Sequence, residues 1–248
     1  MKKIRFYFAR QKLADQELSV KLQGFLMSLI SSDYATFLHQ QETNPYSTNL
    51  LSQGEESVWT VNLVTQEAEQ QFLPLLEGLT EIELRSYPQK IVIERRVIED
   101  YSLEDLFSLF REPVSDTTFH LVLDSPTSFR SQGQYVLFPD LRLLLQSLMQ
   151  KYSRLIDEQE EIDEDLLSYL TEKTQLCSYR LQTHYFSIHR QKIPAFRGSL
   201  TIRFRGAHTA AAYLSMLLRF GEFAGLGIKT SLGMGGMHLE DRKSSSFL

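Results

Sequence analysis

Stretches of alternating apolar and polar residues are separated by stretches with helical spacing along most of the chain. Ile4, Phe6 and Phe8 alternate with more polar neighbours, which predicts a strand at the start. The polar, turn-rich residues 40–49 predict a loop. The other elements expected in the first hundred residues are a helix capped by Asp15, strands at 57–64 and within 81–98, and a helix at 67–79. With a short strand near residues 46–52, the order is β-α-β-β-α-β.

The second half of the chain repeats this rhythm. Phe119, Leu121 and Leu123 mark one face of a strand, and Pro139 is placed to begin a helix. The remaining elements expected are paired strands at 177–189 and 199–205, a helix at 207–218 and a closing strand at 237–240. The chain therefore predicts an α+β fold of two βαββαβ units in tandem. The domains expected are 1–110 and 117–248.

The composition is typical of a globular protein, with 42% hydrophobic and 23% charged residues among 248. No apolar run approaches the roughly 18 residues that a membrane-spanning helix needs, and no signal-peptide pattern follows the basic start. A single cysteine, Cys177, excludes an internal disulfide framework and a multi-cysteine metal site. We expect a cytoplasmic protein with no membrane association, no bound metal and no cofactor.

The charge is segregated along the chain. Residues 173–221 contain no Asp or Glu and eight Lys or Arg residues, which gives this window a charge of +8. Because the whole chain carries −5, the other 199 residues carry −13. A basic region without acids is typical of a surface that binds a polyanion. The alternative is a cationic surface without a ligand.

The most distinctive motif is a glycine-rich loop at residues 225–236, with the sequence GLGIKTSLGMGG. It has neither the spacing of a P-loop nor that of a dinucleotide-binding fingerprint, which disfavours nucleotide hydrolysis and hydride transfer. Lys229, Thr230 and Ser231 add a cation and two hydroxyls to the backbone N–H groups, a combination that suits phosphates. The alternative is close packing of the glycines against the sheet.

The helix followed by this loop resembles the glycine-rich loop of the repeat-cleaving CRISPR endoribonucleases, which belong to the repeat-associated RNA-binding superfamily. Two further segments are similar to that family: Leu38 and His39 followed by residues 44–47 (NPYS), and residues 125–130 (SPTSFR) followed by Phe138 and Pro139. The resemblance covers most of the chain. It implies two tandem ferredoxin-like (βαββαβ) domains and metal-independent cleavage of CRISPR precursor RNA within the repeat.

The resemblance also implies a chemistry. The ribose 2′-OH attacks the adjacent phosphate, which leaves a 5′-OH RNA and a 2′,3′-cyclic phosphate end. His39 matches the family's catalytic histidine by position, and a histidine can accept or donate the proton near neutral pH. The family's lysine position holds Asn44 here, and Lys229 can replace that charge if the loop faces His39. The nearby polar alternatives are Tyr46, Thr48 and the two further catalytic candidates Tyr34 and Ser47. The competing general acid–base candidates are His184 and His189.

RNA binding is expected on the basic region and the loop, where cations can bind phosphates and aromatic rings can stack on bases. Alternation places Arg203 and Arg205 on one face of a strand, whereas Arg130 is implied by the resemblance. The RNA-binding residues expected are Lys229, Thr230, Ser231, Arg190, Lys192, Arg197, Arg203, Arg205 and Arg130. The interleaved aromatic residues are Tyr179, Tyr185, Phe186 and Phe196.

The expected partners are CRISPR repeat RNA and proteins of a CRISPR effector complex, with this protein as a monomer or homodimer. Two other function classes stay open. One is a non-catalytic RNA-binding subunit of a CRISPR effector complex, which would have a similar fold and loop. The other is a polyanion-binding structural protein unrelated to CRISPR.

Overall fold

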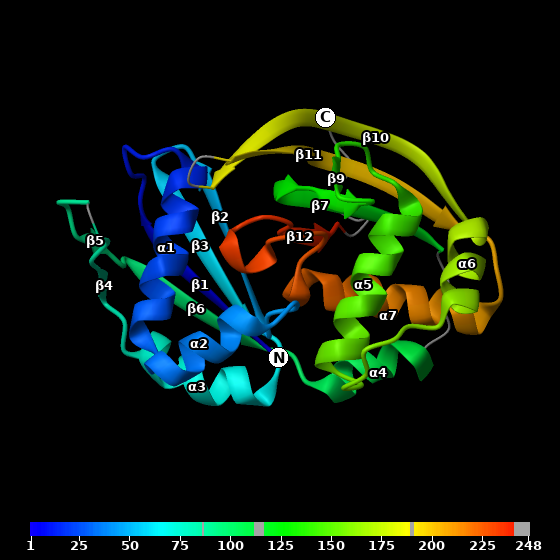
Figure 1. The fold of residues 1–248 in the computed structure, drawn as a ribbon, viewed down its shortest axis with the longest axis horizontal. Helices are drawn as coiled ribbons and strands as arrows, with labels where there is room; N and C mark the ends of the chain where they lie inside the picture. The colour runs from blue at the N-terminus through cyan, green and yellow to red at the C-terminus, as the bar shows by residue number, and fades with distance from the viewer. Residues whose placement is uncertain (86, 112–116, 189–190, 241–248) are drawn as a thin grey trace.

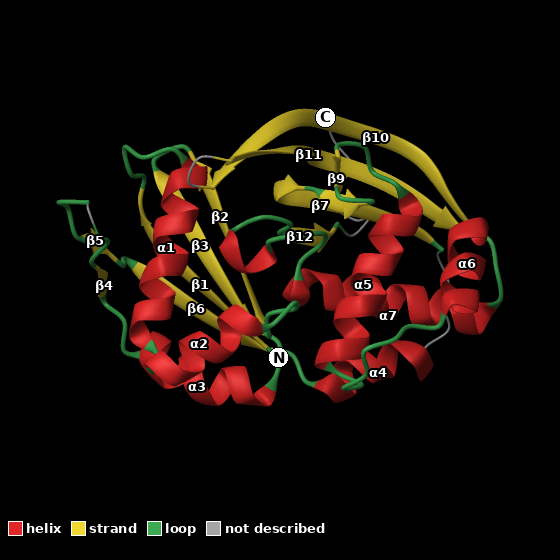
Figure 2. Ribbon diagram, viewed as in Figure 1, coloured by secondary structure: helices red, strands yellow, loops and turns green. Residues whose placement is uncertain are grey.

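The computed structural model describes residues 1–85, 87–111, 117–188 and 191–240. They form two units side by side, each a four-stranded sheet with helices packed on one face (Figures 1 and 2). The first unit consists of β1 (Lys2–Ala9), α1 (Asp15–Leu29), α2 (Ser32–Gln40), β2 (Tyr46–Gln53), β3 (Glu56–Leu63), α3 (Gln66–Glu77), the short hairpin of β4 (Glu81–Ile82) and β5 (Ile91–Val92), and β6 (Arg95–Asp100).

The second unit follows after α4 (Leu103–Arg111), which packs on its last long helix with the Phe110 ring 6.2 Å from that of Tyr213. The unit consists of β7 (Thr118–Thr127), the small hairpin of β8 (Phe129–Ser131) and β9 (Gln134–Val136), α5 (Leu141–Leu155), α6 (Glu164–Lys173), β10 (Thr174–Ile188), β11 (Gln191–Phe204), α7 (His208–Ala224), the 3₁₀ turn η1 (Thr230–Leu232) and β12 (Met237–Leu239). The domain boundaries proposed from the sequence stay a prediction.

The two sheets have equivalent topologies. The strand order is β2-β3-β1-β6 in the first and β10-β11-β7-β12 in the second, and neighbouring strands are antiparallel. In each unit the second, third, first and fourth main strands lie in that order, as in the ferredoxin-like fold. The predicted α+β fold of two tandem βαββαβ units is confirmed.

Apolar alternation places one face of each sheet in a core. Ile4, Phe6 and Phe8 of β1 are fully buried, and the Phe6 ring stacks on Trp59 of β3 at 5.3 Å. In the second unit the predicted strand face is confirmed at Leu121 and the other alternate positions of β7, which pack under α5 and α7. The opposite faces of the sheets are more polar. Among the described residues, no helix is both long and apolar enough to cross a membrane.

Several element boundaries differ from the predictions. Within the stretch 40–49 expected to be a loop, residues 46–49 belong to β2, the short strand expected near residues 46–52, and the Tyr46 ring is buried against Phe72, 5.4 Å away. Asp15 is the first helical residue of α1 instead of its cap, and its carboxylate accepts a hydrogen bond from Ser52 (2.7 Å). Pro139 precedes the cap of α5, whose Asp140 side chain accepts from the Leu143 N–H. The segment 91–98 is divided between β5 and β6.

The β10–β11 hairpin extends beyond its own sheet and arches across the top of the molecule to the first unit (Figure 1). Phe186 and Ile193 near its end form a small apolar cluster with Met234 of the glycine-rich loop and Val20 of α1. The hairpin, the loop and α1 are therefore packed together.

Candidate functional site

The glycine-rich loop, residues 225–236, lies between the two units and is held against the first unit by β2 (Figure 1). Thr48 Oγ1 donates a hydrogen bond to the carbonyl oxygen of Ser231 (3.2 Å). Ser47 Oγ donates to the carbonyl oxygen of Phe223, near the end of α7 (2.5 Å). The start of β2 thus fixes the position of the loop.

Close approach explains why glycines occur in this loop. A Cβ atom at Gly233 would lie 2.7 Å from Cβ of Ser19 in α1. Gly235 has φ +69°, and a Cβ there would lie 2.0 Å from the carbonyl oxygen of Leu226. Both distances are too short for non-bonded atoms, so a larger residue cannot fit without a shift of its surroundings. At these two positions the glycines allow close packing, but against helix α1 and the loop's own backbone rather than against the sheet.

The three phosphate-binding candidates of the loop lie in different surroundings. Lys229 is exposed and has a left-handed backbone conformation (φ +55°), and Ser231 is half-buried. Thr230 is buried, and its hydroxyl accepts a hydrogen bond from Lys151 (3.3 Å). The Thr230 side chain is therefore directed into the protein, whereas Lys229 is open to a ligand. The RNA-binding roles assigned to them stay predictions.

His39 lies in the last turn of α2, a separate helix that begins because the Ser31 side chain accepts a hydrogen bond from the Tyr34 N–H (3.2 Å). Leu38 is buried and anchors the helix, whereas His39 is exposed. The histidine can therefore meet a substrate without a rearrangement of the core.

Tyr34 and Ser47, the other catalytic candidates, are in the interior. The Tyr34 ring is buried between Phe37 and Phe72, and its hydroxyl is without a hydrogen-bond partner among the described residues. Burial raises the pKa of Tyr34 to about 12. Tyr34 and His39 are five positions apart on one helix, so their side chains project about 140° apart around its axis. The structure therefore exposes His39 alone of the three.

Ser47 is buried and serves the junction between the units. Its hydroxyl donates to the Phe223 carbonyl and accepts from the amide of Asn62 (2.9 Å). Because the Ser47 hydroxyl already donates one hydrogen bond and accepts another inside the protein, it is not directed toward a substrate. The catalytic roles of Tyr34 and Ser47 stay predictions without further support from these positions.

The segment that follows His39 is tied to the second unit. Arg154 of α5 forms an ion pair with Glu42 (2.8 Å) and donates a hydrogen bond to Thr43 (3.3 Å). Asn44 then donates to the Ser231 hydroxyl (3.4 Å). These contacts lie three to five residues after His39, so the segment that follows α2 connects the first unit to α5 and to the glycine-rich loop.

The β10–β11 hairpin presents most of the basic candidates. Lys192 is exposed, Arg197 is half-buried, and Arg205 follows the end of β11 on an exposed stretch. Arg203 is half-buried, and its Nε donates to Thr118 (3.2 Å). Arg130 is exposed on β8. Arg190 and His189 lie outside the described residues.

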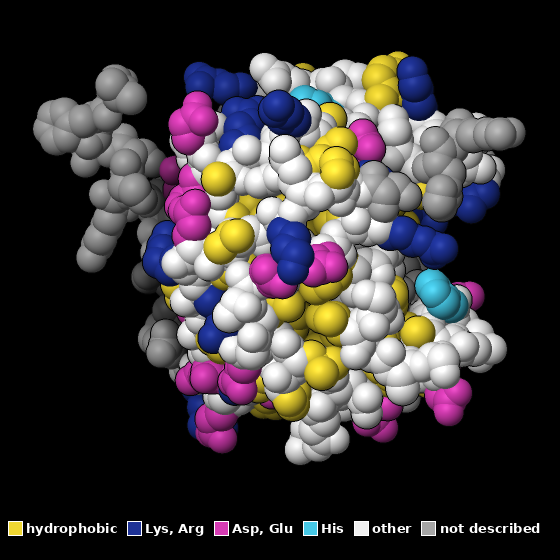
Figure 3. Space-filling model, turned by 90° about the vertical axis from the view of Figure 1, so that its left-hand side faces the viewer, with side chains coloured by type: hydrophobic (Ala, Val, Ile, Leu, Met, Phe, Trp, Pro, Cys, Tyr) yellow, Lys and Arg dark blue, Asp and Glu magenta, His cyan; other side chains and the backbone are white. Residues whose placement is uncertain are grey.

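The hairpin's aromatic residues separate into two groups. Phe186 and Phe196 are buried, whereas Tyr179 and Tyr185 are each 57% exposed. The two tyrosines are therefore the rings available for stacking on a base. On the side of the first unit, Lys and Arg side chains are spread from the top edge over the middle of the face, with acidic side chains among them (Figure 3).

A cleft of about 550 Å³ lies between the open faces of the two sheets. Lys3 and Arg5 from β1 line it, opposite Asp124 from β7 and His238 from β12. His238 Nδ1 lies 2.8 Å from Asp124 Oδ2, and this hydrogen bond raises the pKa of His238. The sequence interpretation missed this cleft. The sequence contained one signal for the cleft: the polar residues that alternate with Ile4, Phe6 and Phe8 lie on the open face of the strand and line it.

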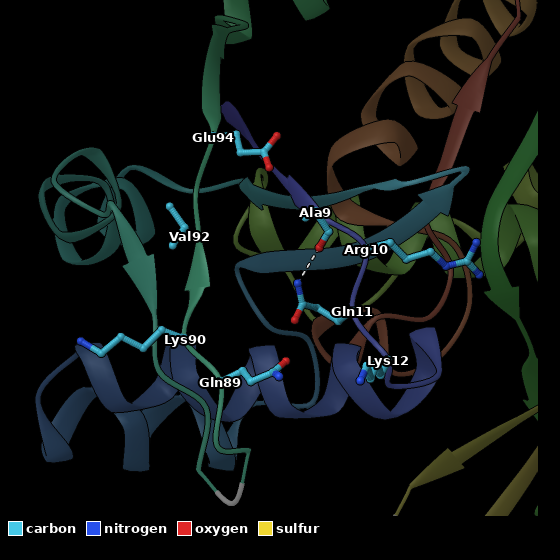
Figure 4. A pocket seen from close by; sticks show the side chains of 8 residues that line it. All are labelled: Ala9, Arg10, Gln11, Lys12, Gln89, Lys90, Val92 and Glu94. Carbon is cyan, nitrogen blue, oxygen red and sulfur yellow. Dashed lines mark hydrogen bonds between the residues drawn. The ribbon is translucent and has the colours of Figure 1, made fainter.

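A second hollow, of about 510 Å³, lies where β1 ends beside β5 (Figure 4). Gln11 donates to the carbonyl of Ala9 there (2.5 Å). Arg10 and Lys90 point in opposite directions (Figure 4), and Lys90 is paired with Glu81 (2.7 Å). Because the Arg10 and Lys90 side chains do not point toward one another, they cannot bind the same anion in this hollow.

Comparisons with known proteins identify the family. The model of a family described as CRISPR-associated endoribonuclease Cas6 matches residues 121–237. A Streptococcus thermophilus protein named CRISPR-associated endoribonuclease Cas6 is 48% identical over 243 residues, which are 98% of this chain and 100% of that protein. The chain belongs to the Cas6 family. A Mycobacterium tuberculosis Cas6 is 34% identical over 90% of this chain and 72% of its own length.

Solved structures support the same assignment at the level of the fold. A structure titled as a Cas6 product complex has a TM-score of 0.77 at 23% identity, covering 97% of this Cas6 chain and 100% of that one. One titled as a RAMP protein binding different RNA substrates has a TM-score of 0.65 at 11% identity, with 97% and 100% coverage. The family resemblance inferred from the sequence is confirmed.

Proposed function

We propose that this Cas6-family protein is an endoribonuclease that cleaves CRISPR precursor RNA within the repeat. The observation that carries the proposal is its 48% identity, over nearly the whole of both chains, with a protein named CRISPR-associated endoribonuclease. The exposed position of His39 beside the junction with the glycine-rich loop is consistent with it.

In the proposed reaction, the 2′-OH of the ribose before the scissile bond attacks the adjacent phosphorus. A general base takes the 2′-OH proton, the P–O5′ bond breaks, and a general acid protonates the leaving 5′ oxygen. The products are a 5′-OH end and a 2′,3′-cyclic phosphate. His39 is the residue available for one of these proton transfers. No metal ion is needed for this route, because cationic side chains can stabilise the charge of the transition state.

Lys229 is the cation proposed for that stabilisation. It is exposed on a loop whose backbone is fixed by close packing and hydrogen bonds, and the same loop contacts the segment after His39 through Ser231. A charge held in place before the reaction stabilises the transition state without a cost of reorganisation. This arrangement supports Lys229 as the replacement for the family's lysine, whose position is occupied by Asn44 in this chain.

The β10–β11 hairpin is proposed to supply affinity for the repeat RNA. Lys192, Arg197 and Arg205 bind phosphates, and Tyr179 and Tyr185 stack on unpaired bases. The exposure of both tyrosines supports this division of roles. CRISPR repeat RNA is then the principal partner, and effector-complex proteins are further partners of the monomer or homodimer.

The test uses a labelled repeat RNA in buffer with EDTA, beside the same RNA with one 2′-deoxy ribose at the scissile position. We expect the first RNA to be cut to a 2′,3′-cyclic phosphate end, and the deoxy RNA to bind with similar affinity and remain intact. Binding of both RNAs without cleavage would instead favour a non-catalytic RNA-binding subunit. Cleavage of the deoxy RNA, or loss of cleavage in EDTA, would contradict the mechanism.

A further inference from the structure

Lys151, in the middle of α5, is a buried lysine that binds the glycine-rich loop from inside the protein. Its ammonium group donates to the carbonyl oxygens of Ala224 (3.3 Å) and Gly225 (2.8 Å) and to the hydroxyl of Thr230 (3.3 Å). An ammonium group has three N–H donors, so these three acceptors match its capacity. Two of the acceptors lie where α7 passes into the loop, and the third, Thr230, lies in the middle of the loop.

The two carbonyl groups belong to the end of α7. The last carbonyls of a helix have no partner within the helix, and the negative end of the helix dipole lies there. A cation is therefore well placed at this point, although burial lowers the pKa of Lys151 to about 7. Moving an ammonium group from water into the protein interior costs free energy unless the group is hydrogen-bonded. The hydrogen bonds of Lys151, rather than its packing, therefore explain a lysine at this buried position.

The third acceptor connects Lys151 to the tip of the loop. Thr230 directly follows Lys229, and the Thr230 Cγ2 atom packs so closely on Gly225 that a Cβ there would lie 2.8 Å away. The Lys229 carbonyl in turn accepts from the Leu232 N–H (3.0 Å). Fixing the Thr230 side chain thus fixes the peptide unit that carries Lys229.

We propose that Lys151 is a positioning residue for RNA cleavage, because it holds the glycine-rich loop that presents Lys229 and that contacts the segment after α2 through Ser231. The inference rests on the proposed function for its link to cleavage. The same helix also binds the segment after His39 through Arg154, one turn from Lys151. Helix α5 therefore contacts both the glycine-rich loop and the segment that follows His39.

The first measurement needs no RNA. Amide hydrogen exchange is compared between the wild type, Lys151→Met and Arg142→Met, a control on the exposed part of α5 whose partner is Glu164 (2.6 Å). In Lys151→Met we expect exchange at loop amides such as Leu226 and Gly235 to be faster by at least about tenfold, with the amides of β1 unchanged. Arg142→Met leaves both sets unchanged. Equal loop exchange in all three proteins overturns the proposal.

The second measurement separates positioning from general stability. We expect kcat of Lys151→Met on the repeat RNA to fall by roughly 10–100-fold, while the Kd for the uncleavable 2′-deoxy RNA changes by less than about threefold. In a Lys229→Ala background, the same substitution should lower kcat by less than about threefold, since it acts through Lys229. An equal loss in both backgrounds, as partial unfolding would give, overturns the proposal.

The two measurements distinguish a failure of this proposal from misfolding of the variant and from a failure of the proposed function. If Lys151→Met does not fold, Lys151→Gln, which keeps an N–H₂ donor, takes its place in both measurements with the same expectations. If the wild-type protein leaves the repeat RNA uncut, the proposed function fails and the link of Lys151 to cleavage fails with it. Loop exchange then still decides whether Lys151 holds the loop.

Discussion

The two ferredoxin-like units share a topology but differ in the length of their central hairpins and in what they expose. Strands β2 and β3 have eight residues each, whereas β10 and β11 have 15 and 14. The longer pair reaches the first unit and carries the cations of an acid-free stretch. Each unit has a second helix before its second main strand, α2 in the first unit and α6 in the second, but α2 carries an exposed histidine, His39, in its last turn.

In the proposed function, one fold therefore supplies two kinds of chemistry from its two copies. The first unit would supply the group for proton transfer, His39, and the second the positive charge of the long hairpin. The glycine-rich loop belongs to the second unit in sequence but packs on the first. Substitutions in the three regions should therefore have distinguishable effects: loss of the chemistry alone, loss of the junction, or loss of affinity alone.

The largest effect is expected from His39→Ala. An alanine can neither accept nor donate a proton, so the rate of repeat cleavage should fall by about 10²–10⁴-fold. The affinity for uncleavable RNA and the free energy of unfolding should change little, because the side chain is exposed. Single-turnover cleavage and RNA titration measure both, with Gln40→Ala on the same turn as control. Normal cleavage by His39→Ala and loss of it in His184→Ala would move the catalytic centre to the hairpin.

The next largest effect is expected from Gly235→Ala, which disrupts the junction between the units. The left-handed backbone costs about 1–2 kcal/mol for a residue with a Cβ, and the contact with the Leu226 carbonyl adds about 1–3 kcal/mol. We expect the free energy of unfolding to fall by about 3 kcal/mol. Gly54→Ala is the matched control, since Gly54 has φ +60° in open space and should cost about 1 kcal/mol. Denaturant titration compares the two; equal losses would exclude the close contact as a cause.

The fold was predictable from the sequence because its signals are local. Alternation in β1 and β7 and helical spacing in α5 and α7 each depend on residues within one element. The start of β2 gives a mixed local signal, because a strand is expected near residues 46–52 while the polar stretch 40–49 predicts a loop over some of the same residues. Tyr46 is preceded by polar, turn-forming residues, and it becomes a strand residue because α1 and Phe72 cover its ring. Tertiary packing overrides local preference there.

The candidate site was predictable only in part, for a related reason. The positive charge of the hairpin and the exposure of His39 follow from local composition. The orientation of Thr230 depends on Lys151, 79 residues earlier in the chain, and the buried bonds of Ser47 depend on Phe223 in the other unit. The sequence alone does not show which hydroxyls of a polar motif are directed into a junction and which toward a ligand.

A smaller effect is expected from Arg203→Ala combined with Arg205→Ala. If each arginine binds one phosphate, the slope of log affinity against log salt should become less negative by about 1.4, at about 0.7 per phosphate for a single strand. The cleavage rate of bound RNA should stay the same, which separates this region from His39. Titrations at several salt concentrations measure the slope, with Arg142→Ala as the control for an exposed arginine. An unchanged slope would place both side chains away from the RNA.

The smallest effect is expected at His238, in the cleft where the open faces of the two units meet. The hydrogen bond that His238 donates to the Asp124 carboxylate raises the folded-state pKa of His238 above its ordinary value of 6.5. The stabilisation is therefore fully present below about pH 6.5 and is lost as the pH rises through the raised pKa. Because the side chain is 45% exposed, His238→Ala should lower the free energy of unfolding by no more than about 1 kcal/mol at pH 5 and by less at pH 9. Denaturant titrations at both values, repeated with Asp124→Asn, test the origin of the effect. The pH dependence of the His238→Ala difference should vanish in the Asp124→Asn background, and its persistence there would mean that another group raises the pKa of His238.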